Sequence, residues 1–187
     1  MEKIIALDKE VLILFNNLGT EQWDGFWLLI TKQLHWSLFF ALIFYLMIKK
    51  IGWKQFGYIV VFLSLLILVT DQLTNLSKFS FQRLRPCNDP SVNNLIRVVQ
   101  ERSSFSFFSG HASNSMASTT FFFLIFRKYY RYAFLLFLFP LIFAYSRIYL
   151  GLHFPIDILV GFLVGIINGT LFYKLYRYAQ ERHFPIL

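Results

Sequence analysis

Three short groups of polar residues stand at the ends of apolar runs, and their residue types suit the handling of phosphate. The first group is Lys78, followed after six residues by Arg85-Pro86. Arginine offers a planar fork of donors to phosphate oxygens, and the lysine ammonium adds a point charge. Lys78, Arg85 and Arg147 come from three different segments of the chain. Their residue types predict a site in which all three bind one phosphoryl group. Taken singly, each could instead extend toward lipid headgroups at a membrane border.

The second group, Ser109-Gly110-His111, directly precedes an apolar run. Glycine lets the backbone approach an anion closely, and the first N–H groups of a helix form an anion site. A histidine there can exchange a proton near neutral pH. The alternative for His111 is a capping or interfacial side chain.

The third group is Ser146-Arg147, then His153 after five residues and Asp157 after three more. Pro155 fits the first turn of a helix, which places Asp157 within reach of His153. A carboxylate facing an imidazole orients the ring and stabilises its positive form, as in activated nucleophiles. Asp157 could also serve simply as a first-turn acid for the helix dipole.

The composition indicates a membrane protein. Of 187 residues, 57% are hydrophobic and only 15% are charged, whereas soluble domains average about 25% charged. The net charge of +8 does not indicate nucleic-acid binding, because half of the basic residues form clusters beside apolar runs. Such clusters mark the cytoplasmic ends of membrane helices. They are Lys49, Lys50, Lys54; Arg127, Lys128, Arg131; and Lys174, Arg177, Arg182.

The apolar runs predict an all-α, polytopic transmembrane helix bundle with five spans, six being the alternative. A proline at 140 predicts a bend in one of them. The first run is short and is expected to extend back through Leu34 toward Phe26, with a polar interruption formed by Thr31, Lys32, Gln33 and His35. The runs cover residues 36–48, 56–70 (continuing to about 78), 112–126, 132–145 and 154–173.

The N-terminal segment 4–18 has apolar residues at helical spacing, which fits a helix lying on the membrane surface or packed against the bundle. It has acidic residues and no small-residue cleavage site, so it does not resemble a cleaved signal peptide. We expect one domain over residues 1–187. Residues 1–33 form interfacial helices in it, residues 34–178 the bundle, and residues 79–111 an outer loop.

Alternating spans place the three basic clusters on the cytoplasmic side and the three motif groups on the outer side. Gly161, Gly165 and Gly169 share one face of the last span and predict close helix packing within the bundle, with a contact between two copies of the chain as the alternative. The single cysteine, Cys87, excludes an internal disulfide and a cysteine-based metal site.

The three groups together resemble the signature of the type 2 phosphatidic acid phosphatase superfamily, the integral membrane lipid phosphate phosphatases, in its small bacterial members. That signature is Lys, six residues, Arg-Pro; Pro-Ser-Gly-His; and Ser-Arg, five residues, His, three residues, Asp. The match covers residues 78–157. One position departs from it, since Phe108 stands where the family has proline, and we expect activity to survive this change.

The resemblance implies that His153 attacks phosphorus to form a phosphohistidine, that Asp157 orients His153, and that His111 protonates the leaving oxygen. It implies that no metal or cofactor is required and that the chain lies in the inner membrane of a bacterium. The phosphate-binding set that it implies is Lys78, Arg85, Ser109, Gly110 and Arg147.

The expected function is therefore hydrolysis of a phosphomonoester or diphosphate on a lipid. Within the family we favour undecaprenyl diphosphate as substrate, and the alternatives are phosphatidate, phosphatidylglycerophosphate and lipid A phosphate. Two different classes of function remain, a catalytically inactive lipid-phosphate binding protein and a transporter. A transporter would carry polar stripes along several spans, whereas the polar residues here gather at span ends.

Overall fold

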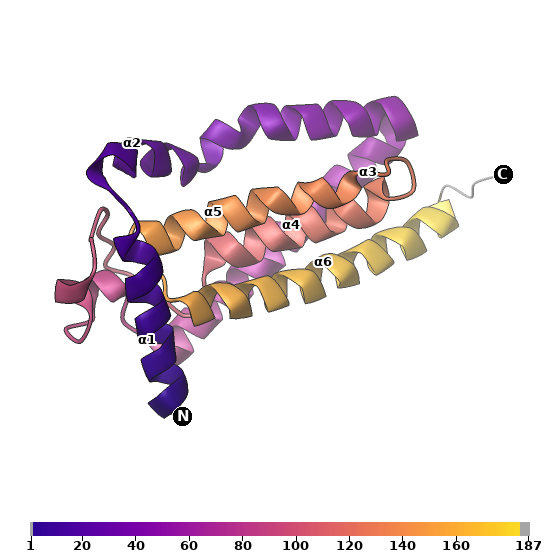
Figure 1. Ribbon diagram of the computed structural model, residues 1–187. Helices are drawn as coiled ribbons and strands as arrows, with labels where there is room; N and C mark the ends of the chain where they lie inside the picture. The colour runs from indigo at the N-terminus through magenta and orange to yellow at the C-terminus, as the bar shows by residue number, and fades with distance from the viewer. Residues whose placement is uncertain (1, 184–187) are drawn as a thin grey trace.

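The computed structural model describes residues 2–183, which form six α-helices joined by loops and short 3-10 turns. Met1 and residues 184–187, which belong to the expected domain, lie outside the described residues. Figure 1 shows the long helices running side by side, with α1 crossing one end of them. The helices are α1 (Glu2–Asn17), α2 (Glu21–Ile30), α3 (Ser37–Phe81), α4 (Gly110–Phe126), α5 (Leu138–Tyr149) and α6 (Pro155–His183).

Helix α3 consists of two arms that meet at Gly52. This residue has a φ of +78°, a left-handed conformation that glycine adopts without steric cost. The chain therefore reverses at this point, and the two arms run in opposite directions (Figure 1). The arms correspond to the two apolar runs predicted before and after the Lys49–Lys54 cluster.

The expected extension of the first run back toward Phe26 was wrong. Helix α2 ends at Ile30 and is separate from α3. The polar residues Thr31 and Lys32 interrupt the helix, and a 3-10 turn, Gln33–Trp36, leads into α3. Pro140 lies in the first turn of α5, which directly follows the 3-10 segment Ala133–Phe137. The bend expected at this proline stays a prediction.

Two helical stretches within residues 2–183 are long and apolar enough to cross a membrane. They are Gln33–Leu95, which includes both arms of α3, and Pro155–Arg182. Ala133–Tyr149, which combines a 3-10 segment with α5, is a shorter apolar helix. Many large apolar side chains on these helices are exposed, among them Leu42, Val61, Leu163 and Ile167. A lipid environment would cover such a surface.

Helix α4 lies at the centre of the bundle and packs closely along α6. A methyl group added at Gly165 would lie 2.6 Å from the carbonyl oxygen of Ser113, and one at Gly169 would lie 2.5 Å from that of Ala117. The glycine stripe of α6 therefore faces α4 of the same chain, as predicted for packing within the bundle. The alternative, a contact between two copies through these glycines, conflicts with this packing.

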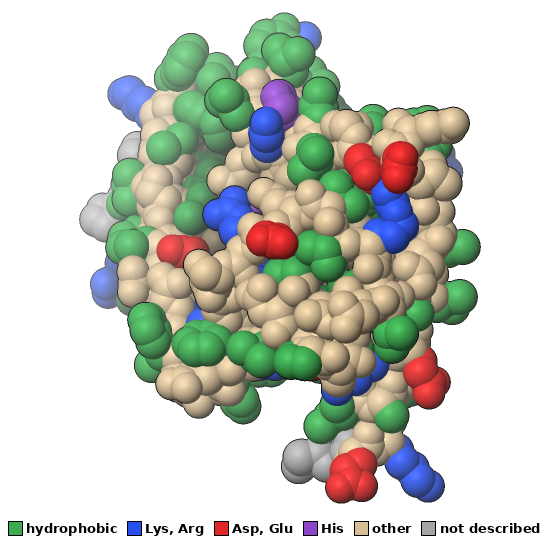
Figure 2. All heavy atoms as spheres, turned by 90° about the vertical axis from the view of Figure 1, so that its left-hand side faces the viewer, with side chains coloured by type: hydrophobic (Ala, Val, Ile, Leu, Met, Phe, Trp, Pro, Cys, Tyr) green, Lys and Arg blue, Asp and Glu red, His purple; other side chains and the backbone are tan. Residues whose placement is uncertain are grey.

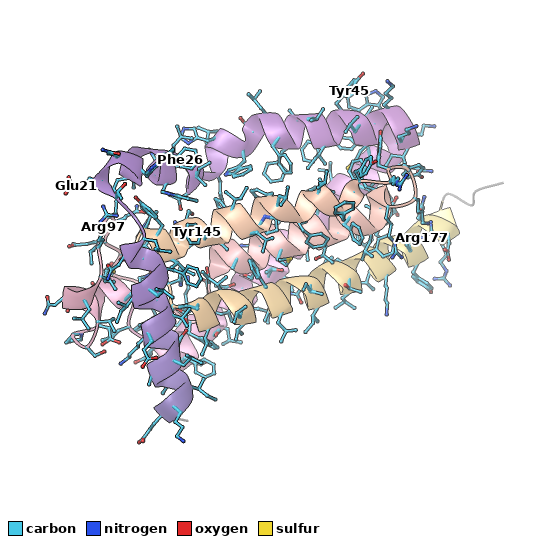
Figure 3. All side chains as sticks on the ribbon, in the orientation of Figure 1. Glu21, Phe26, Tyr45, Arg97, Tyr145 and Arg177 are labelled. Carbon is cyan, nitrogen blue, oxygen red and sulfur yellow. The ribbon has the colours of Figure 1, made fainter. Side chains whose placement is uncertain are left out.

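The bundle has two distinct ends. Loop 82–109 and the α5–α6 connection gather at one end with α1 and α2, and we call this the site end (Figure 1). At the opposite end, the basic end, Lys50 lies over the ring of Tyr130, and Lys128 and Arg177 line one depression. Figure 3 shows Arg97 at the site end and Arg177 at the basic end.

Candidate active site

His153 lies in the short connection between α5 and α6. Gly151, with a φ of +74°, turns the chain after α5, and the backbone N–H of His153 donates to the carbonyl oxygen of Arg147 at 3.3 Å. Helix α6 then starts at Pro155, and Asp157 lies in its first turn. The backbone N–H of Phe154 donates to Asp157 Oδ2 at 3.0 Å, so this carboxylate also caps the helix.

The two nitrogens of His153 have different partners. Nδ1 lies 3.2 Å from Ser106 Oγ and 3.5 Å from Asp157 Oδ2, and Ser106 Oγ donates to the same carboxylate oxygen at 2.5 Å. Nε2 lies 2.9 Å from Arg85 Nη1, which can only donate. This network assigns the proton of neutral His153 to Nδ1 and leaves a lone pair on Nε2. A lone pair on Nε2 is what attack on phosphorus requires.

The surroundings of His153 favour its neutral form. The side chain is fully buried, and burial together with the nearby Arg85 lowers the pKa of His153 to about 3, although Asp157 acts in the opposite direction. The imidazole is therefore a free base over the whole physiological range of pH. A carboxylate beside it stabilises the positive charge that would develop when Nε2 forms a bond.

Arg85 is held by three acceptors besides His153. Its Nε donates to the carbonyl oxygen of Ser104 at 2.7 Å, Nη2 donates to Ser104 Oγ at 3.0 Å, and Nη1 donates to the carbonyl oxygen of Leu152 at 2.9 Å. The guanidinium is thus fixed directly over the lone pair of Nε2. A phosphoryl group that reaches Nε2 must meet this guanidinium, as the prediction of a phosphate-binding role for Arg85 requires.

His111 and Arg147 line a cavity of about 380 Å³ at the site end, together with Thr31, Lys32, Gln33, Gln100 and Arg102. Arg147 donates to Thr31 Oγ1, and its Nε is buried without a partner among the described residues. The ring of His111 stacks on Phe143 at 5.2 Å between centroids. A buried guanidinium N–H without a partner next to a cavity is suited to an anionic ligand.

The remaining predicted residues lie around this centre, although their contacts differ. Lys78 lies within electrostatic range of Arg85 and Arg147, and its ammonium has no hydrogen-bond partner in the described part of the chain. Ser109 is fully buried, and its hydroxyl accepts from the N–H of Ala112 at 3.4 Å as the N-cap of α4. The cap uses the Ser109 oxygen only as an acceptor, and the binding of phosphate by this hydroxyl stays a prediction. Gly110 begins α4 against Thr74.

Sequence patterns did not reveal Arg83, Asp8 and Ser106 as part of this site. Arg83 donates to Asp157 Oδ1 at 2.7 Å and to Asp8 Oδ2 at 2.6 Å. Ser106 links His153 to Asp157, as described above. The signals that the sequence offers are a second arginine two residues before Arg85, an acid within the amphipathic segment 4–18, and a serine inside an aromatic segment. Figure 2 shows acidic and basic side chains mixed on this end of the molecule.

The sequence comparison identifies the class of protein that this site belongs to. Residues 57–181 match the PAP2 superfamily, which is more than half of the chain, so the chain belongs to this family of membrane lipid phosphatases. The family comprises metal-independent hydrolases of lipid phosphates.

The relatives come from bacteria. The chain is 33% identical over 177 residues to a lipid A 4'-phosphatase of Bacteroides thetaiotaomicron, with 92% of this chain and 78% of the relative covered. It is 33% identical over 186 residues to a lipid A 4'-phosphatase of Porphyromonas gingivalis, with 97% and 78% covered.

Two solved structures share the fold. The crystal structure of Aquifex aeolicus LpxE matches with a TM-score of 0.69 at 26% identity, covering 88% of this chain and 93% of that one. A transmembrane PAP2 type phosphatidylglycerolphosphate phosphatase from Bacillus subtilis matches with a TM-score of 0.71 at 19% identity, covering 100% and 90%. The second likeness concerns the fold alone.

Proposed function

We propose that the chain removes a phosphate monoester from a lipid A-type glycolipid through a phosphohistidine on His153. The relation to two lipid A 4'-phosphatases over 92% and 97% of the chain supports this substrate class. Undecaprenyl diphosphate, which we favoured from the sequence, takes second place because these comparisons support the lipid A alternative better. The hydrogen bonds around His153 support the proposed chemistry.

In the first step, the lone pair of Nε2 of His153 forms a bond to phosphorus while the bond from phosphorus to the lipid oxygen breaks. The negative charge of the bound phosphate offsets the nearby Arg147, Lys78 and Arg85, so His111 takes up a proton when the substrate binds and gives it to that leaving oxygen. The proton on Nδ1 stays in place, and the positive charge of the phosphorylated ring is balanced by Asp157 through Ser106. The negative charge on the phosphoryl oxygens is stabilised by Arg85, Arg147 and Lys78. In metal-dependent enzymes a metal ion supplies this stabilisation.

In the second step, a water molecule attacks phosphorus and the bond from phosphorus to Nε2 breaks. His111, now neutral, accepts a proton from this water. Inorganic phosphate leaves, and His153 returns to its neutral form with the lone pair on Nε2. The burial of His153 favours this return, because the neutral ring is the stable form in its surroundings.

The cavity next to His111 suits a polar headgroup. Besides Arg147, it presents the amides of Gln33 and Gln100, the hydroxyl of Thr31 and the ammonium of Lys32. The Oε1 atom of Gln100 is buried and has no partner among the described residues. Sugar hydroxyls would satisfy such groups, whereas the hydrocarbon of an isoprenoid chain would leave them unpaired.

We further propose that five helical segments cross the inner membrane of a bacterium with the site end outward. The segments are the two arms of α3, α4, the 133–149 segment and α6. The clusters of lysine and arginine lie at the opposite end, as the positive-inside tendency requires for the cytoplasmic side. Helix α1 would then lie at the outer interface, with its exposed apolar residues Ile4, Leu7 and Leu14 toward the lipid.

Release of inorganic phosphate from purified protein tests this proposal. The lipids compared are lipid A, undecaprenyl diphosphate, phosphatidate and phosphatidylglycerophosphate, each in the same detergent. We expect the largest kcat/KM with lipid A and none in the His153→Gln variant. A larger kcat/KM with undecaprenyl diphosphate would refute the substrate assignment, and full activity of His153→Gln would refute the chemistry.

A further inference from the structure

We infer that Asp8 and Arg83 are positioning residues for the nucleophile, so that the N-terminal helix α1 is a working part of the active site. This inference rests on the proposed role of His153 and extends it to residues far away in the sequence. It assigns a task to two charged side chains that the proposed reaction does not itself use.

The guanidinium of Arg83 joins two buried carboxylates. Its Nη1 donates to Asp157 Oδ1 at 2.7 Å, and its Nη2 donates to Asp8 Oδ2 at 2.6 Å. Its Cζ atom also lies over the ring of Phe154, 3.9 Å from the ring centroid. Because Arg83 takes up Oδ1, the other oxygen of Asp157 is left to face Ser106 and His153. Arg83 therefore fixes the rotation of the carboxylate that orients His153.

Asp8 is completely buried, and both of its oxygens are occupied. Oδ2 accepts from Arg83, and Oδ1 accepts from the backbone N–H of Ile156 at 2.8 Å. Ile156 lies in the first turn of α6, where backbone N–H groups have no partner within the helix. One carboxylate of α1 thus holds both the arginine and the start of the helix that carries Asp157.

The rest of α1 keeps Asp8 in this position. Leu12 and Asn16, four and eight residues further on, lie on the same buried face. The amide of Asn16 donates to the carbonyl oxygens of Ile148 and Tyr149 at 3.0 and 2.9 Å, and its Oδ1 accepts from the N–H of Arg97 at 2.6 Å. Helix α1 is therefore attached to the end of α5 as well as to α6.

Asp8 also sets the charge around His153. Arg83 and Arg85 bring two positive charges close to His153, and Asp157 and Asp8 bring two negative ones, so the four side chains sum to zero (+2 − 2 = 0). Without Asp8 the sum would be positive, which disfavours the positive ring that forms when His153 bonds to phosphorus. Neutralising Asp8 removes this charge and also frees Arg83 from one of its two acceptors.

The variants Asp8→Asn, Arg83→Met and Arg83→Lys test the inference, with Lys9→Met as the matched control. Lys9 is the neighbour of Asp8 on α1, and its ammonium bonds to Ser91 and lies 3.9 Å from Asp89, away from Asp157. The readout is the rate and amplitude of phosphoenzyme formation in a single turnover with a labelled lipid phosphate. The amplitude counts competent molecules, and the rate reports the attack by His153.

We expect Asp8→Asn and Arg83→Met to slow phosphoenzyme formation by about 10- to 100-fold, the range for lost charged hydrogen bonds. The amplitude should persist, KM should change little, and Arg83→Lys should recover part of the rate. Lys9→Met should match the unaltered protein. A lower amplitude with an unchanged rate would show that these residues serve stability only, and would overturn the inference.

A second measurement does not depend on turnover. The ¹⁵N NMR signals of histidine report the tautomer, and His153 can be assigned among the four histidines by its loss in His153→Gln. We expect the Nδ1–H tautomer in the unaltered protein and a mixture in Asp8→Asn. Identical tautomers would overturn the inference. Absence of any phosphoenzyme in the unaltered protein would instead refute the proposed function.

Discussion

Gly165 determines how closely α4, which carries His111, can approach α6, which carries Asp157 and follows His153. In a Gly165→Ala variant, the new methyl carbon would lie 2.6 Å from Ser113 O, 2.8 Å from Met116 Cβ and 2.9 Å from Ala117 N. Two of these three atoms belong to the backbone and cannot rotate away. Contacts of a Cβ atom are essentially never shorter than 3.0 Å and are ordinary from 3.4 Å, so the helices must separate by about 0.4 Å (3.0 − 2.6) to 0.8 Å (3.4 − 2.6).

A separation of this size affects both stability and chemistry. Overpacking of this kind costs about 1–3 kcal/mol. Near the site, α4 and α6 are joined by the hydrogen bond from Ser109 N to Asp157 O at 3.0 Å. A shift between them moves His111 relative to His153, and a misplacement of about 1 Å can cost about 100-fold in rate. We therefore expect Gly165→Ala to lower both the unfolding temperature and kcat.

The matched control is Gly57→Ala, because a methyl group at Gly57, which is also in a long helix, meets nothing within 4 Å. This change should leave the protein as stable or stabilise it by up to about 1 kcal/mol, since alanine favours a helix over glycine. Thermal unfolding and phosphate release in one detergent compare the two variants. Equal stability and activity in both would refute the close packing of α4 on α6.

Three further predictions concern the site itself. Burial lowers the pKa of His153 to about 3 from its ordinary 6.5, so below pH 6.5 the unfolded chain binds a proton that the folded chain does not. Stability should therefore fall between pH 6.5 and 5, and His153→Phe should lose about 1.6 kcal/mol less over this range in unfolding experiments. An equal loss in both proteins would contradict the neutral, buried imidazole. Ser106→Ala should lower kcat about tenfold with little change in KM, because it removes the bridge to Asp157, and unchanged kcat would exclude that bridge from catalysis. Treatment with a strong chelator should leave phosphate release unchanged, and loss of activity that added Mg²⁺ restores would count against charge stabilisation by arginine and lysine alone.

The contacts that the sequence predicts well are those between residues close together in the chain. His153 lies just before α6 and Asp157 lies in the first turn of that helix, so their proximity follows from local geometry. The same holds for Ser109 as the residue before α4 and for Pro155 at the start of α6. The glycine stripe of α6 likewise follows from helical period alone, although its partner, α4, does not.

The contacts that the sequence does not reveal join distant segments. Asp8 and Arg83 are 75 positions apart, and Asn16 reaches Ile148 across 132 positions. In sequence, Asp8 is one acid in an amphipathic segment, and such an acid is usually exposed. Its burial depends on the docking of α1 against α6, which helical periodicity cannot specify. Arg83 and Arg85 also look alike in sequence, yet one binds a carboxylate and the other faces the nucleophile.

The most direct test of the proposed chemistry is to trap the phosphorylated protein. Brief reaction with a lipid carrying labelled phosphate, followed by alkaline quenching, preserves a phosphorus–nitrogen bond, and mass spectrometry of the peptides locates the label. We predict a phosphoryl group on His153, absent in His153→Gln and more persistent in a variant that slows the attack of water, His111→Gln. Turnover without any label on His153, or a label on another residue, would contradict the role assigned to His153.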